Sequence, residues 1–135
     1  MNRRRRKKLQ DRLVVAAGFG TPGQVAAILR AGADPSLPNR SQTTPLYRAS
    51  VQNRALAIEL LLAAGADPDA ESGTGDEGLP LCAAACWGHD AAVRALLAAG
   101  ADPTRREDGG TGHTALEWAE SGGHTTTTEL LRAPQ

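Results

Sequence analysis

Aromatic side chains are scarce in this chain of 135 residues. They make up 3% of the sequence and consist of Phe19, Tyr47, Trp87 and Trp118. Hydrophobic residues nevertheless account for 41%, so a buried core must be built mainly from leucine, alanine, valine and isoleucine. Because side chains of this kind let helices approach closely, the composition suits one compact domain or one short array of helices.

Cysteines and long apolar runs are also few. Cys82 and Cys86 are the two cysteines, and they lie four residues apart in an alanine-rich stretch. A disulfide framework needs more cysteines than this. No run of 18 apolar residues is present, and glycine and proline soon interrupt the apolar segment 13–17, which argues against a signal peptide. We therefore expect a cytoplasmic protein, and the excess of arginine over lysine, with abundant alanine and glycine, indicates a bacterial source.

The formal net charge is zero, but the charges are unevenly distributed. The rest of the chain has nine basic and fifteen acidic residues, because six of the fifteen basic residues are clustered near the start. The cluster consists of Arg3, Arg4, Arg5, Arg6, Lys7 and Lys8. This pattern predicts a basic, disordered arm at 1–8 in front of a mildly acidic domain at 9–135. The arm is either a solubilising tail or a tether to nucleic acid or an anionic membrane.

An internal repeat sets the fold. The segment Ala-Gly-Ala-Asp-Pro occurs at 31–35, 64–68 and 99–103, so its copies are 33 and 35 residues apart. A second marker, Thr-Pro-Leu at 44–46, recurs with substitutions at 79–81 and 114–116, each time 35 residues later. A fixed period of this length is typical of stacked repeat proteins. We divide the chain into units at about 9–40, 41–75, 76–110 and 111–135.

Each unit is predicted to contain two short helices. Thr44 can cap the first helix, and Pro45 suits the first helical position because it has no amide hydrogen to leave unpaired. The second helix carries apolar residues at i, i+3 and i+4, as in Val93, Leu96 and Leu97. The glycine of each Ala-Gly-Ala-Asp-Pro segment then ends that helix with a positive φ. One such pair cannot bury its apolar stripe alone, so neighbouring pairs must stack.

These motifs resemble the ankyrin repeat family. The third unit is the best match, with Leu-Pro-Leu-Cys-Ala-Ala-Ala-Cys-Trp-Gly-His at 79–89. The resemblance implies an all-α solenoid of about four helix-turn-helix repeats, with the first and last units as caps. It also implies that His89 and His124 make structural hydrogen bonds in the Gly-His turns. The second unit departs from the pattern, because Tyr47 and Arg48 stand where the family has histidine and leucine.

Two segments match the dinucleotide-binding pattern G-x-G-x-x-G, at 18–23 and 73–78. A dinucleotide site needs these glycines between a strand and a helix of a parallel sheet. The first segment instead falls at the turn between the helices of unit one, and the second falls in a long connection rich in acidic residues. We interpret both as flexible turns and expect no cofactor.

Two cysteines and a histidine lie close together in the sequence, but their pattern does not indicate a metal site. Cys82, Cys86 and His89 lie near one another, but no fourth ligand follows at the spacing of a tetrahedral site. The three histidines have repeat-related explanations, so no nucleophile, base and orienting group remain to be assigned. We expect no metal ion and no enzymatic activity.

Members of the ankyrin family usually bind protein partners on the concave face, which is formed by the long connections, or fingers, and the first helix of each unit. The resemblance therefore implies a monomeric protein-binding module. Trp87 is placed near the centre of the site, flanked by Arg40, Gln52 and Asp76, whereas Trp118 is interpreted as structural. The candidate contact residues are Phe19, Arg40, Thr43, Val51, Gln52, Asp76, Cys86, Trp87, His113 and Ser121.

Overall fold

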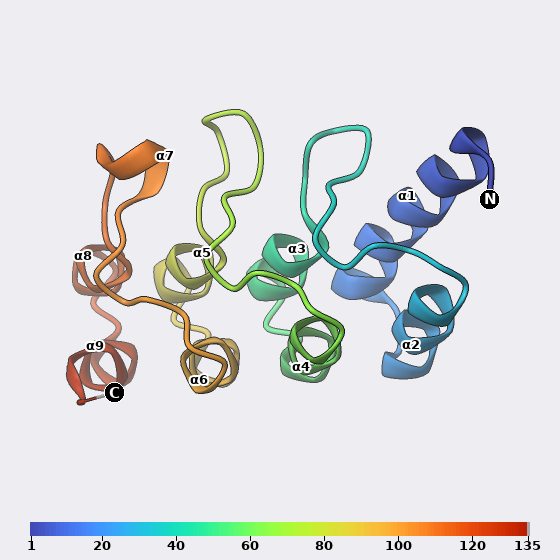
Figure 1. Cartoon of the computed structure of the whole chain (residues 1–135). Coiled ribbons are helices and arrows are strands. Elements are labelled where there is room, and N and C mark those ends of the chain that lie inside the picture. Colours follow the sequence, from blue (N-terminus) through green and yellow to red (C-terminus); the bar gives the residue numbers. More distant parts are fainter. Residues whose placement is uncertain (135) are drawn as a thin grey trace.

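The computed structural model describes residues 1–134 as a row of stacked helix pairs (Figure 1). The helices are α1 (Arg3–Phe19), α2 (Pro22–Arg30), α3 (Pro45–Val51), α4 (Ala55–Ala63), α5 (Pro80–Cys86), α6 (Asp90–Ala98), α7 (Glu107–Gly110), α8 (Ala115–Ser121) and α9 (Thr125–Arg132). Within residues 1–134 there is no β-strand, and one isolated bridge joins Ser72 to Gly78. The predicted all-α repeat solenoid is therefore confirmed.

The helices form two rows. The inner row contains α1, α3, α5 and α8, and the outer row contains α2, α4, α6 and α9. Each helix contacts the next helix of its own row, and the two helices of a unit contact each other. The fingers at 34–44, 67–79 and 102–114 are called the second, third and fourth fingers, after the unit that each one leads into. They project from the inner row on the side away from the outer row (Figure 1). We call the surface made by these fingers and the inner row the finger face.

Local sequence signals explain where the helices begin and end. The Thr44 hydroxyl accepts a hydrogen bond from the Tyr47 amide at 3.2 Å, and Pro45 follows as the first residue of α3. Thr114 caps α8 in the same way and adds a reciprocal bond with the Glu117 side chain. At the other end of each unit, Gly65 and its counterparts have positive φ, as the repeat predicts.

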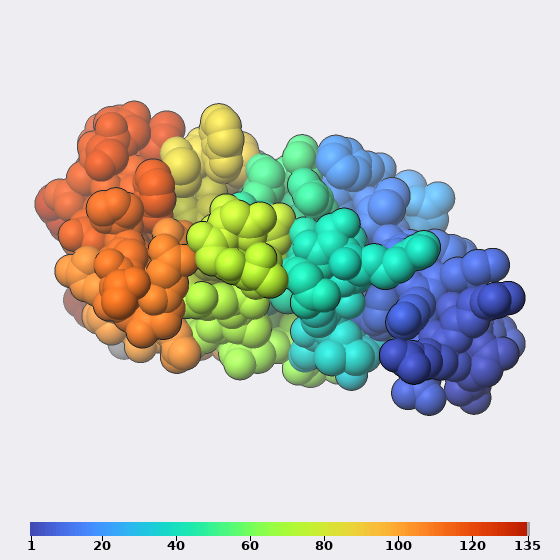
Figure 2. All heavy atoms as spheres, turned by 90° about the horizontal axis from the view of Figure 1, so that it is seen from above, coloured from blue at the N-terminus to red at the C-terminus, as the bar shows by residue number. Residues whose placement is uncertain are grey.

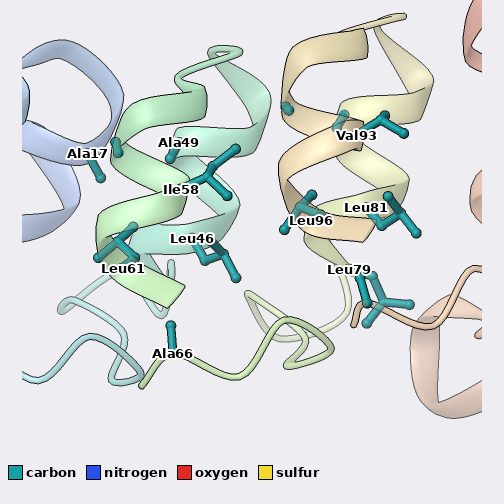
Figure 3. Close-up of a cluster of buried hydrophobic side chains, with 14 of the residues drawn as sticks. Ala17, Leu46, Ala49, Ile58, Leu61, Ala66, Leu79, Leu81, Val93 and Leu96 are labelled. Atoms are coloured by element: carbon teal, nitrogen blue, oxygen red, sulfur yellow. The ribbon is translucent and has the colours of Figure 1, made fainter. Parts of the chain in front are cut away.

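The core consists of aliphatic side chains between the rows. Ile58, Leu61, Val93 and Leu96 are fully buried, as the helical period of the outer row predicts (Figure 3). Alanines fill the inner row, where Ala17, Ala49, Ala84 and Ala119 are each 0% exposed. Since these side chains are small, the inner helices stack closely.

The first helix is longer than the sequence predicts. Residues 1–8 are expected to form a disordered arm, but α1 begins at Arg3, so that the basic cluster lies in its first two turns. The Asn2 side chain caps this end by accepting a hydrogen bond from the Arg5 amide at 2.8 Å. Arginine and lysine are good helix formers, and the helix continues into buried Leu9 and Leu13, which fix it to the stack.

Histidines connect neighbouring units. His89 Nε2 donates a hydrogen bond to the Val51 carbonyl oxygen at 3.0 Å. His124 Nε2 makes the equivalent bond to the Cys86 carbonyl oxygen, also at 3.0 Å. Each imidazole thus hydrogen-bonds to a backbone carbonyl oxygen at the end of the inner helix of the preceding unit. This is the structural role that the family resemblance implies.

Candidate protein-binding surface

Hydrogen bonds across the finger face hold the second and third fingers together. The Thr44 amide donates to the Ser72 hydroxyl at 2.8 Å, and that hydroxyl donates to Glu77 Oε1 at 2.7 Å. The Thr43 hydroxyl donates to Glu77 Oε2 at 2.9 Å. These bonds occupy both carboxylate oxygens of Glu77 and fix the position of the third finger against the second.

One predicted contact residue is therefore unavailable. Thr43 is only 3% exposed and its hydroxyl is engaged by Glu77. Its prediction as a partner contact is wrong, because the bond between two fingers buries a side chain that the repeat pattern places at the finger base. Val51 and Cys86 are half-buried, and the remaining candidates are exposed.

The structure brings three of the predicted residues together. Asp76, Cys86 and Trp87 line one pocket between the third and fourth fingers and the inner row. Arg40 lies elsewhere, because its guanidinium pairs with Asp11 at 2.7 Å. Gln52 lies next to Gly18 of α1. Of the three residues predicted to flank Trp87, only Asp76 lines its pocket.

Phe19 and Ser121 also lie outside this pocket. Phe19 is 64% exposed and lines a separate hollow at the first end of the stack, together with Val15 and Gln24. Ser121 is exposed at the end of α8. The predicted residues thus divide among several places on the surface.

The pocket beside Trp87 has a volume of about 320 Å³. Five charged or aromatic residues that were not among the predicted contacts also line it: Tyr47, Glu77, Glu107, Asp108 and Trp118. Ala83 lines it too, at the position that holds Arg48 in unit two and Trp118 in unit four. The small alanine between two large side chains is a sequence signal for a hollow at this point of the inner row.

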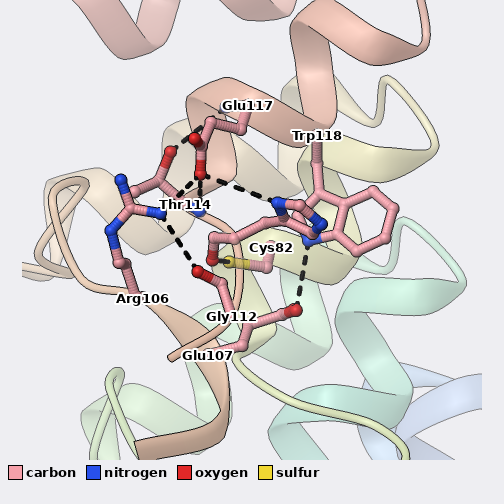
Figure 4. Close-up of polar contacts among 8 residues, drawn as sticks. Cys82, Arg106, Glu107, Gly112, Thr114, Glu117 and Trp118 are labelled. Atoms are coloured by element: carbon pink, nitrogen blue, oxygen red, sulfur yellow. Dashed lines mark hydrogen bonds and ion pairs between the residues drawn. The ribbon is translucent and has the colours of Figure 1, made fainter. Parts of the chain in front are cut away.

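Glu107 and Trp118, which both line the pocket, are joined by a hydrogen bond (Figure 4). Trp118 Nε1 donates a hydrogen bond to Glu107 Oε2 at 3.1 Å, and Glu107 is 8% exposed. Burial raises the pKa of the Glu107 carboxyl above its usual range, although its hydrogen bonds with Trp118 and Cys82 oppose the shift. His113 packs edge-on against the Trp118 ring with centroids 5.0 Å apart.

Backbone hydrogen bonds within the last finger fix the position of Glu107. The Glu107 amide donates to the His113 carbonyl oxygen at 3.1 Å, and the Gly112 amide donates to the Glu107 carbonyl oxygen at 2.8 Å. Between these bonds, α7 is a single tight turn in which Asp108 has a φ of 53°. This conformation is uncommon for a residue other than glycine, and aspartate is one of the side chains that tolerate it best.

Charges around the pocket also affect its thiols and phenol. Burial raises the pKa of Tyr47, and the carboxylates of Glu77 and Glu107 raise it further. Burial and Glu107 raise the pKa of Cys86, and the pKa of buried Cys82 is raised for the same reasons. Both thiols therefore remain protonated at neutral pH, which disfavours metal binding and nucleophilic reactions through a thiolate.

The described residues provide no metal centre and no membrane span. Within residues 1–134, no group of three or more histidine, cysteine, aspartate or glutamate side chains could hold a metal ion. In the same part of the chain, no helix is both long enough and apolar enough to cross a bilayer.

The two rows of helices, the projecting fingers and the glycine-terminated units define a helical repeat solenoid. A family model described as ankyrin repeats (3 copies) matches residues 13–107, which is more than half of the chain. The chain therefore belongs to the ankyrin repeat family. Ankyrin repeats are generally protein–protein interaction modules. No curated protein matches this chain.

Proposed function

We propose that this protein acts without catalysis and binds a protein partner through the finger face, with Trp87 at the centre of the contact. The exposure of Trp87 supports this proposal: this residue follows the last residue of α5 and is 63% exposed. The alternative, that Trp87 packs on a neighbouring unit as core, does not fit this exposure. Large aromatic side chains contribute most to binding when a partner covers them. We also propose the cytoplasm as its location.

The residues around Trp87 give the proposed site a defined shape. Trp118 and Glu107 are fixed by their mutual hydrogen bond, and the third finger is fixed by Glu77. Trp87 lines the same pocket and is largely exposed. A rigid pocket next to an exposed indole requires little ordering when a partner binds, so less binding energy is lost.

Replacement of Trp87 by alanine tests the proposal. Partners are first identified by co-purification with the full chain, and their affinity is then measured by calorimetry. Trp87→Ala is expected to weaken binding by at least about tenfold, as for other central aromatic contacts. The fold should be unaffected, since the side chain is largely exposed.

Leu56→Ala is the matched control. Leu56 is 60% exposed, but it lies on α4 of the outer row, away from the finger face. The Leu56→Ala variant should therefore bind the partner with the same affinity as the unchanged chain. Equal affinities of the Trp87→Ala variant and the unchanged chain, with both proteins folded, would exclude Trp87 from the contact.

A second candidate function is attachment to a polyanion through the basic turns of α1. One hollow of about 770 Å³ is lined by the cationic side chains Arg3, Arg4, Lys7, Lys8 and Arg40. Five cations around one hollow favour phosphate groups of nucleic acid or of an anionic membrane. Salt-dependent retention on DNA or on anionic vesicles tests this candidate.

A further inference from the structure

The pocket beside Trp87 contains acidic side chains without a basic one. Asp76, Glu77, Glu107 and Asp108 line it, and its lining includes no lysine, arginine or histidine. In the part of the chain that the structure describes, the ion pairs involve other carboxylates, those of Asp11, Glu117 and Glu120. In the described residues, the four acidic residues of the pocket therefore form no ion pair, although His113 lies close enough to Glu107 to lower its pKa.

The hydrogen bonds of these carboxylates come from neutral donors. Glu77 accepts from the Ser72 and Thr43 hydroxyls, and Glu107 accepts from the Trp118 indole. Asp76 accepts from the backbone amide of Thr74 at 3.0 Å. Such bonds position the carboxylates but leave their negative charge in place. Burial is the main cause of the raised pKa values of Tyr47 and Cys86, and the nearby carboxylates raise both further, while Arg48 opposes the shift at Tyr47.

Aromatic rings surround the same space. Tyr47, Trp87 and Trp118 line the pocket, and they are three of the four aromatic residues in the whole chain. The face of an aromatic ring is electron-rich and attracts cations, most strongly for tryptophan. A planar guanidinium can stack on such a face while its N–H groups pair with a carboxylate, whereas an ammonium group is more strongly hydrated and forms no planar stack.

We propose that this pocket receives an arginine side chain from the protein partner, with the guanidinium between the Trp87 indole and the carboxylates of Asp76 and Glu107. The inference rests on the proposed function, since it specifies the chemistry recognised by the same surface. A volume of about 320 Å³ is at the lower end of ligand pockets, so the pocket accommodates a single side chain rather than a folded element.

The basic cluster of the chain itself does not occupy this pocket. Its residues lie in the first turns of α1, at one end of the stack, whereas the fourth finger and α8 are at the other end (Figure 1). A cation that complements the charge of the pocket would thus come from outside the molecule, which is the reason for assigning it to a partner.

A peptide titration tests this inference without knowledge of the partner. The probe is acetyl-Gly-Gly-Arg-Gly-Gly-amide, titrated into the 15N-labelled full chain up to about 10 mM, since single-residue contacts bind in the millimolar range. The indole N–H signals of Trp87 and Trp118 report on the pocket, because the chain has no other tryptophan. Both signals are expected to shift saturably with the arginine peptide.

Two further peptides separate charge from shape. Citrulline has nearly the shape of arginine but no charge, and it is expected to bind at least about fivefold more weakly. A lysine peptide is also expected to bind more weakly than arginine. Equal binding of the citrulline peptide, or tighter binding of the lysine peptide, would overturn the assignment to a guanidinium.

Variants locate the binding. Trp87→Ala and Asp76→Asn change exposed residues and should weaken the arginine peptide by about 3- to 30-fold. Glu107→Gln should weaken it similarly while keeping an acceptor for Trp118. Glu59→Gln, an exposed carboxylate on α4, is the matched control and should leave the affinity unchanged.

Failure of this inference is distinguishable from failure of the proposed function. If the arginine peptide causes no saturable shift, the guanidinium assignment is wrong, even if Trp87→Ala still weakens the natural partner. If the peptide binds but Trp87→Ala leaves the affinity for the partner unchanged, the pocket recognises a cation and the partner contact lies elsewhere.

Discussion

At the scale of single residues, Glu107 shows how one buried carboxylate shapes the site. Its pKa is raised chiefly by burial, so the native protein binds its proton more tightly than the unfolded chain does. Ionisation of Glu107 therefore opposes folding, and this cost is absent below the unfolded-state pKa and fully present above the native one. The carboxylate is retained at a cost in stability, which is common at binding sites.

Two substitutions of Glu107 separate its charge from its hydrogen bond. Glu107→Gln removes the ionisation cost and keeps an acceptor for Trp118, so the variant should gain stability relative to the unchanged chain on going from pH 4 to pH 7. Glu107→Ala leaves the indole N–H of half-buried Trp118 without its partner and should destabilise by about 1–3 kcal/mol. Urea unfolding followed by tryptophan fluorescence measures both effects.

The opposite pH trend for Glu107→Gln would contradict the raised pKa. Glu59→Gln serves as the reference for the loss of an exposed carboxylate, because Glu59 makes no contact with the pocket. Its stability relative to the unchanged chain should vary little over the same pH range.

At the scale of elements, the sequence predicts the helices mainly from the residues at which they begin and end. Thr44 and Pro45 predict the start of α3, and the glycines of the Ala-Gly-Ala-Asp-Pro segments predict the ends of α2, α4 and α6, and the structure confirms these boundaries. The first turns of α1 could not be predicted in this way. They lack apolar periodicity, and they are helical because Asn2 caps them and Leu9 anchors the following turn.

Glycine substitutions test this reading of helix ends. Gly65 has a φ of +107° and an added Cβ would meet nothing within 4 Å, so any cost of Gly65→Ala comes from the backbone. We expect destabilisation by about 1–2 kcal/mol. Gly23 lies in the first turn of α2 with an ordinary φ, and Gly23→Ala should stabilise by about 0.5–1 kcal/mol. Thermal unfolding measures both.

Changes of the same sign for the two glycine variants would show that helix propensity, and not the positive φ, determines the effect. Both sites are exposed, so loss of packing does not complicate the comparison.

At the scale of the whole molecule, the repeat period predicts which residues are neighbours but not how the fingers fold. The 35-residue period aligns Trp87 with Gln52 and Gly122, and it predicts that Trp87 is distinctive on the inner row. It does not predict that Thr43 is buried by Glu77, or that the turn at Asp108 brings Glu107 under Trp118. Those contacts depend on the conformations of the fingers, of which those at 67–79 and 102–114 are two residues longer than the one at 34–44.

The surface has opposite charges in two places. Figure 2 views the molecule onto the fingers, with the basic turns of α1 at one end and the third and fourth fingers, which carry the acidic residues of the pocket, farther along. Since α1 is helical from Arg3, four of its cations line one hollow together with Arg40. A polyanion and the proposed arginine-bearing partner would therefore bind at separate sites.

Neutralising the basic hollow tests whether it binds polyanions. Changing Arg3, Arg4 and Lys7 to glutamine keeps α1 helical, because glutamine is also a good helix former, whereas deleting the segment would remove two helical turns. If the hollow binds phosphates, the unchanged chain is retained on DNA or anionic vesicles at low salt. The triple variant should then show a salt dependence of binding that is shallower by up to about three charges.

The control replaces Arg12, Arg30 and Arg94 by glutamine, which removes the same charge from exposed positions that do not line this hollow. Retention that falls equally in both triple variants would reflect net charge alone, and the basic hollow would then have no specific role. Retention on vesicles but not on DNA would assign the hollow to a membrane surface, and the reverse would assign it to nucleic acid. Because the acidic pocket is unchanged in both variants, the arginine peptide should bind each of them as it binds the unchanged chain, apart from a small effect of net charge.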